Sequence, residues 1–127
     1  MTAQLEKQAI LIIEKVLWSI HNKEYKAIVN HVDETEIGDM DSLFQFVQGT
    51  LELNGYDSID EYGVPCDFHP IYEYSQMNFY EFEDNSGFAV DYDLTSDSEL
   101  VDMCLQMKFL YTADGGMRSV FVGIDPR

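Results

Sequence analysis

Carboxylates are the side chains through which this chain could do chemistry, and their distribution along the sequence is uneven. Nineteen Asp and Glu residues lie between Ala27 and Met107, and no Lys or Arg interrupts them. The chain carries a formal net charge of −17 over 127 residues, whereas a net charge of about 2–8 of either sign is enough to keep a small domain soluble. Self-repulsion of this size destabilises the compact state, so the charge indicates a functional role. The simplest such role is binding a strongly basic partner.

Two groups of carboxylates are the candidate contacts with that partner. The sheet-side group lies in and just after a predicted strand and comprises Asp91, Asp93, Asp97 and Glu99. The connector group lies between two predicted helices, where a loop can present every side chain, and comprises Asp33, Glu34 and Glu36. Taken singly, each of these residues also fits a solvated surface. The absence of interspersed cations favours binding, because like charges opposite one another across strands are destabilising.

Tyrosines are the candidate aromatic anchors of the same surface. Tyr combines apolar area with a hydrogen-bonding tip and is enriched in protein interfaces. Strand alternation turns Tyr92 inward, so Tyr72 and Tyr74, which flank Glu73, are the preferred anchors. Trp18 lies in the first predicted helix and is interpreted as a core or semi-buried packing residue rather than a ligand platform.

The sequence gives little support to metal binding or catalysis. Pairs such as Asp91 and Asp93 lack the 12-residue calcium-loop pattern, and His21, His31 and His69 are isolated from one another and from the thiols. There is no G-x-S-x-G elbow, phosphate loop or nucleophile–His–Asp spacing. We therefore expect no metal, no cofactor and no enzymatic activity.

The charge also excludes two classes of partner. Binding to nucleic acid requires clustered Lys and Arg, and an anionic membrane surface repels an acidic protein in the same way. The apolar run from Ala9 to Ile13 is too short for a signal-peptide core or a membrane span. Together with Cys66 and Cys104, interpreted as free thiols, these features predict a cytoplasmic protein.

Hydrophobic periodicity predicts one α+β domain over residues 1–127. Apolar residues at three- and four-residue steps predict helices over about 2–21 and 23–31 and a third starting at Asp39 or Asp41, so the helices occupy about 2–62. After residue 70 the period changes to two, which predicts four strands within about 71–124. The expected architecture is three N-terminal helices packed on one face of a four-stranded antiparallel meander sheet.

The order of these elements resembles the cone-shaped, nuclear-transport-factor-like and cystatin-like domains. The resemblance rests on Asn22-Lys23-Glu24-Tyr25 and on the strand pair 87–94 and 100–105. It implies a pocket between the helices and the concave sheet, lined by Phe44, Phe79, Tyr92 and Met103.

The small size and acidity are similar to those of immunity proteins of bacterial contact-dependent toxin systems. This resemblance implies a binding protein that neutralises a basic toxin domain, most plausibly a nuclease, through its acidic, tyrosine-rich surface. The alternative is a domain that binds a small ligand, or acts weakly on one, in the pocket implied by the cone resemblance. A third interpretation is a subunit or adaptor without a basic target.

Overall fold

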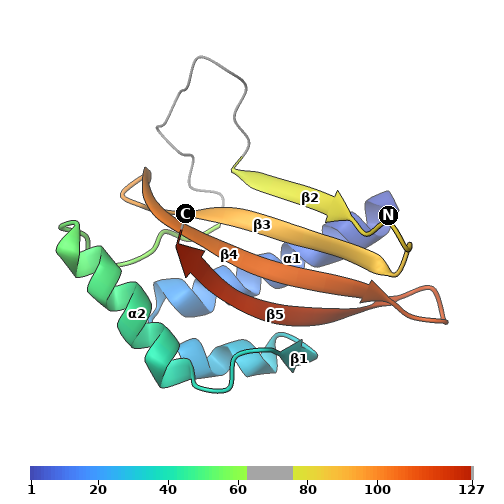
Figure 1. Ribbon diagram of the computed structural model, residues 1–127, viewed down its shortest axis with the longest axis horizontal. Coiled ribbons are helices and arrows are strands. Elements are labelled where there is room, and N and C mark those ends of the chain that lie inside the picture. Colours follow the sequence, from blue (N-terminus) through green and yellow to red (C-terminus); the bar gives the residue numbers. More distant parts are fainter. Residues whose placement is uncertain (63–75, 127) are drawn as a thin grey trace, which may run out of the picture.

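The computed structural model describes residues 1–62 and 76–126, and Figure 1 shows their arrangement. Two α-helices, one 3₁₀ helix and five strands follow in the order α1 (Ala3–His21), η1 (Tyr25–Asn30), β1 (Glu34–Thr35), α2 (Met40–Leu53), β2 (Met77–Glu81), β3 (Gly87–Ser96), β4 (Glu99–Tyr111) and β5 (Met117–Pro126). The predicted α+β class is therefore correct for the described residues.

The described strands form one mixed sheet in the order β1-β5-β4-β3-β2, with β1 parallel to β5 and the other pairs antiparallel. The prediction of a four-stranded antiparallel meander is wrong, because the connector supplies a fifth, parallel strand at the β5 edge. A two-residue strand is too short to show alternation in the sequence. Backbone hydrogen bonds hold it, from Asp33 N–H to Ser119 O at 3.1 Å and from Glu36 N–H to Phe121 O at 2.9 Å.

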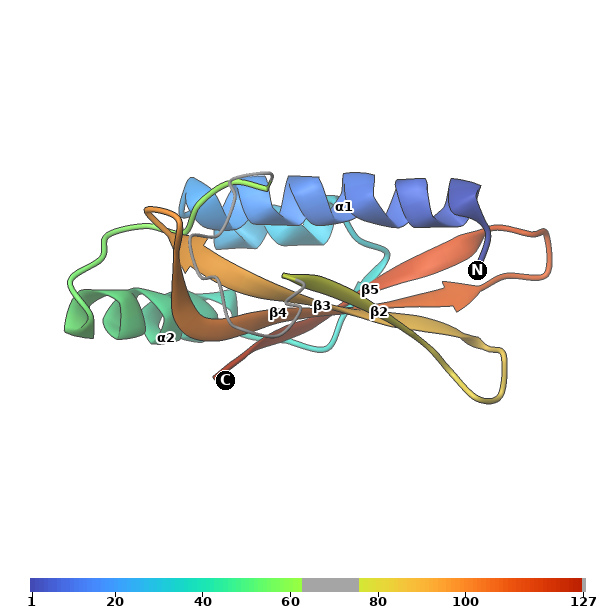
Figure 2. The same cartoon turned by 90° about the horizontal axis from the view of Figure 1, so that it is seen from above.

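The first helix confirms its sequence pattern. Thr2 caps it, since its hydroxyl accepts the Leu5 N–H at 3.2 Å, and residues at three- and four-residue steps, such as Ala9, Ile13 and Val16, are fully buried. Figures 1 and 2 show α1 running along one face of the sheet. This helix therefore provides one wall of the core, and its opposite side faces solvent.

The other helices depart from the predicted single layer. The second one is a 3₁₀ helix, η1, beside α1, while α2 lies beyond the β5 side of the sheet (Figures 1 and 2). Asp39 caps α2 by accepting the N–H groups of Asp41 and Ser42, both at 3.1 Å. The α2 helix then packs on η1 through Phe44, whose ring meets Tyr25 edge-on at 5.4 Å.

The inward-facing residues of β3 and β4 confirm the predicted alternation. The fully or nearly fully buried side chains are Phe88, Val90, Tyr92 and Leu94 on β3 and Val101, Met103, Leu105, Met107 and Phe109 on β4. Phe88 stacks on Phe109 with ring centroids 5.2 Å apart. These layers fill the space between the sheet and the helices, and Asp91, Gln106 and Lys108 lie on the other face of the sheet.

Candidate functional site

The turn between β3 and β4 is the best-defined part of the predicted acidic surface. Ser96 pairs with Glu99, and the two residues between them, Asp97 and Ser98, have φ of +51° and +66°. Positive φ at both central positions is the pattern of a type I′ turn, which joins twisted strands tightly. The turn therefore presents Asp97 and Glu99 at one end of the sheet, on the left in Figure 1.

A carboxylate distant in the sequence holds this turn. The Asp60 side chain accepts the Thr95 hydroxyl at 2.9 Å, the Asp97 N–H at 3.1 Å and the Ser98 N–H at 2.8 Å. The Asp60 N–H in return donates to Thr95 O at 2.8 Å. Because these contacts use both carboxylate oxygens, Asp60 positions the turn rather than serving as an open contact.

Tyr56 lies among these acidic groups. Its hydroxyl donates a hydrogen bond to Glu99 Oε2, and this bond, followed by partial burial and the charges of Glu99 and Asp97, raises the pKa of Tyr56 above its ordinary value. A phenol with carboxylates around it is the combination that the sequence led us to expect at Tyr72 and Tyr74. Those two residues lie outside the described part of the chain, so their role stays a prediction.

An irregularity in the sheet brings two more carboxylates to the same end. The β3–β4 pairing shifts between the pairs Asp93–Cys104 and Thr95–Leu100, and Asp102 within the shift has φ of +56°. Asp93 and Asp102 line a hollow of about 150 Å³ together with Leu100 and Met103. We call Tyr56, Asp60, Asp93, Asp97, Glu99 and Asp102 the acidic hairpin end.

Asp91 lies further along the same sheet face as Asp93. Its cross-strand neighbours are Asn78 on β2 and Gln106 on β4, and Asp93 pairs with Cys104. The β3 carboxylates therefore stand directly opposite neutral residues. The repulsion across strands that we expected from the sequence is avoided by the register.

The connector group is compensated within the molecule. Asp33 accepts the Ser119 N–H at 2.8 Å, Glu34 forms an ion pair with Arg118, and Glu36 Oε2 lies 3.3 Å from Lys108 Nζ. The two cations, Lys108 and Arg118, are distant in the sequence, and the pairing of β1 with β5 beside β4 brings them next to the connector. The connector residues keep their prediction as partner contacts, but the charges of Glu34 and Glu36 are paired with cations.

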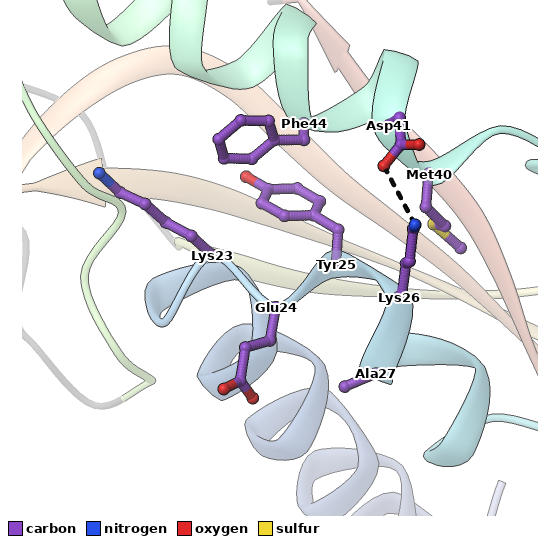
Figure 3. A pocket seen from close by; sticks show the side chains of 8 residues that line it. All are labelled: Lys23, Glu24, Tyr25, Lys26, Ala27, Met40, Asp41 and Phe44. Atoms are coloured by element: carbon purple, nitrogen blue, oxygen red, sulfur yellow. Dashed lines mark ion pairs between the residues drawn. The ribbon is translucent and has the colours of Figure 1, made fainter.

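A cavity of about 420 Å³ lies between η1 and α2, and Figure 3 shows the residues around it. Its lining residues are Lys23, Glu24, Tyr25, Lys26, Ala27, Met40, Asp41 and Phe44. Lys26 Nζ lies 3.7 Å from Asp41, and burial raises the pKa of Tyr25 well above its usual range.

The placement of this cavity differs from that of the pocket implied by the cone resemblance. Phe44 faces it, whereas Tyr92 and Met103, expected in the same pocket, are 5% and 1% exposed in the core. His69 lies outside the described residues. Over residues 1–62 and 76–126, no group of three or more His, Cys, Asp and Glu could hold a metal ion.

Trp18 is not a core residue, and of the two positions expected for it the semi-buried one is nearer to the structure. Its side chain is 46% exposed on the solvent side of α1, and Leu11, one heptad earlier, is 55% exposed. Periodicity could not show this, because an apolar residue at the border of the buried stripe can turn to either side.

The fold and its surface define a small α+β domain with an acidic end at one hairpin. Residues 18–126 match a family described as a domain of unknown function (DUF7668), and the chain belongs to this family. No curated protein and no solved structure matches the chain. Among the described residues, no helix is long and apolar enough to cross a membrane.

Proposed function

We propose that this protein is an immunity-type binding protein that neutralises a basic protein toxin in the cytoplasm, with a nuclease as the best-fitting target. The observation that carries the proposal is the charge of three carboxylates of the acidic hairpin end, Asp97, Glu99 and Asp102. Lys and Arg form ion pairs with Glu34, Glu36, Asp41 and Asp57. Asp97, Glu99 and Asp102 take part in none of them.

The chemistry of a nuclease cleft suits this surface. Such a cleft places Lys and Arg where phosphates bind, and carboxylates can occupy the same positions. Complementary charge raises association rates towards about 10⁸ M⁻¹s⁻¹ at low salt. Since screening acts over about 8 Å at physiological ionic strength, exposed carboxylates such as Asp97 would mainly set the association rate.

The test compares two double variants with the same change in charge. Asp97→Lys with Glu99→Lys reverses the acidic hairpin end, and Glu24→Lys with Glu83→Lys reverses two exposed glutamates elsewhere. The partner is the toxin encoded next to this reading frame, and the measurement is its affinity by calorimetry at two salt concentrations. We expect the hairpin variant to bind at least tenfold more weakly, or about 1.4 kcal/mol, and the control less than about threefold more weakly.

Two outcomes would contradict the proposal. Equal weakening by both variants would show that net charge, and not the acidic hairpin end, determines affinity. A neighbouring toxin that stays fully active in excess of this protein would remove the immunity function itself.

The cavity between η1 and α2 favours the second candidate function, binding of a small ligand. Lys23 and Lys26 in its lining and the Tyr25–Phe44 pair in its wall suit a small aromatic or aliphatic anion, whose negative group would replace Asp57 and Asp41 beside the lysines. A rise in the melting temperature with a carboxylate or phosphate compound, abolished by Lys26→Met, would favour this candidate over the first.

A further inference from the structure

The solvent side of α1 carries an aromatic residue between charged neighbours. Glu14 and Lys15 lie three and four residues after Leu11, and Trp18 lies four residues after Glu14 and three after Lys15, so the four residues share one side of the helix. All four are exposed, whereas Ile13, Val16 and Leu17 between them are fully buried. An indole that is nearly half exposed here is available to a partner.

Two hollows share Glu14 and Trp18 in their linings and differ in charge. One, of about 300 Å³, is lined by Glu14, Trp18, Glu61 and Tyr62, and the other, of about 330 Å³, by Glu14, Lys15, Trp18 and His31. The first combines an indole, a phenol and two carboxylates, and none of the described residues that line it is a Lys or Arg. We call it the Trp18 hollow.

The walls of the Trp18 hollow are held by the fold. The Tyr62 ring lies 5.8 Å from the ring of the buried Tyr92. Glu61 Oε1 lies 3.6 Å from His21 Nε2, and the other ring nitrogen of His21 lies 2.7 Å from the carbonyl oxygen of Ile59. The carboxylate of Glu61 nevertheless keeps 56% of its side-chain surface exposed, so a partner can reach it.

The hollow is continuous with the acidic hairpin end. Glu61 and Tyr62 directly follow Asp60, whose carboxylate holds the β3–β4 turn. In Figure 2 the segment after α2 runs up beside the C-terminal end of α1. One partner can therefore contact both surfaces.

We propose that the Trp18 hollow binds an arginine side chain of the basic partner. This inference rests on the proposed function and adds the residue type that is recognised. A guanidinium stacks on an indole face, the best of the aromatic faces for a cation, and pairs with carboxylates through its planar fork. Lysine lacks that plane and that fork, and an apolar side chain would leave Glu14 and Glu61 desolvated without a partner.

The experiment uses nona-arginine and nona-lysine peptides as probes at about 50 mM salt, where charge attraction is weakly screened. Trp18 is the only tryptophan of the chain, so its fluorescence reports on the hollow directly. We expect nona-arginine to change the Trp18 emission and to bind more tightly than nona-lysine. Trp18→Ala should weaken nona-arginine about three- to tenfold and nona-lysine less than about twofold, as measured by calorimetry.

Two further variants separate the hollow from general effects. Glu14→Gln with Glu61→Gln removes both carboxylates, keeps the side-chain shapes and should weaken nona-arginine by a similar factor. Leu11→Ala is the matched control, because it truncates an exposed apolar residue on the same side of the helix, and it should leave both affinities unchanged. Circular dichroism checks that each variant is folded.

The outcomes distinguish this inference from the proposed function. If the Trp18 and glutamine variants bind nona-arginine like the wild type while the Asp97→Lys, Glu99→Lys variant does not, the hollow is not the arginine site and the acidic hairpin end stands. If wild-type protein binds neither peptide with a Kd below about 1 mM, both the inference and the proposed function fail.

Discussion

Replacing Asp60 with Ala removes the acceptor that holds the β3–β4 turn. The Asp60 carboxylate accepts the Thr95 hydroxyl and the N–H groups of Asp97 and Ser98, over 2.8 to 3.1 Å. Without it, two backbone donors of the turn lose their partners, at residues that already have positive φ. Non-glycine residues are disfavoured in that conformation, so the turn should open and the acidic hairpin end should lose its shape.

The size of the effect follows from these three contacts. A hydrogen bond to a charged group contributes about 1.5–3 kcal/mol, but water replaces part of it at a half-buried site and the contributions are not additive. We therefore expect Asp60→Ala to lower the free energy of unfolding by about 2–4 kcal/mol. With an unfolding entropy of about 0.27 kcal/mol/K for a chain of this length, the melting temperature should fall by about 7–15 °C.

Thermal unfolding followed by circular dichroism measures this change, and Asp57→Ala is the matched control. Asp57 lies in the same segment but makes one exposed ion pair, with its carboxylate 3.3 Å from Lys23 Nζ. Its loss should lower stability by less than about 1 kcal/mol. Asp60→Asn, which keeps one carbonyl acceptor, should be intermediate. If Asp60→Ala melts within about 3 °C of the control, the carboxylate does not hold the turn.

Two further predictions concern the packing of the fold. Gly87→Ala would place a Cβ 2.1 Å from the carbonyl oxygen of Phe109, so it should lower the free energy of unfolding by about 3 kcal/mol or more. Gly49 lies in α2 with open space around it, so Gly49→Ala should instead raise the free energy of unfolding by about 0.5–1 kcal/mol. Denaturant titration measures both, and similar stabilities for the two variants would contradict the β3–β4 register. Burial raises the pKa of Tyr25, so the unfolded chain loses this proton first as pH rises above about 10 and stability falls there. Tyr25→Phe lacks that proton and should lose less stability than the wild type between about pH 9 and 11.5; parallel losses would show that the ring is accessible to solvent.

Part of the candidate site was predictable from the sequence. Asp97 and Glu99 were expected at a turn after the second predicted strand, and the structure places them at the β3–β4 turn. The roles of Asp60 and Tyr56 were not predicted. Asp60 contacts a turn that lies 35 to 38 residues further along the chain, and no local pattern encodes such a contact.

The ion pairs of the connector group were not predictable from the sequence either. No Lys or Arg lies among its carboxylates in the sequence, yet Lys108 and Arg118 meet Glu36 and Glu34 across the sheet edge. Charge patterning along a chain therefore predicts the total charge of a surface but not which of its carboxylates remain uncompensated.

The sequence by itself determined the α+β class, the caps and buried side of the helices and the inward residues of β3 and β4, because hydrophobic periodicity and capping act within a few residues. The tertiary structure alone decided the parallel pairing of β1 with β5, the position of α2 beside η1 and the exposure of Trp18. These depend on contacts between distant segments, such as Asp33 with Ser119 at a separation of 86 residues. Such contacts form only when the packed core has brought the two segments together, so local propensity does not predict them.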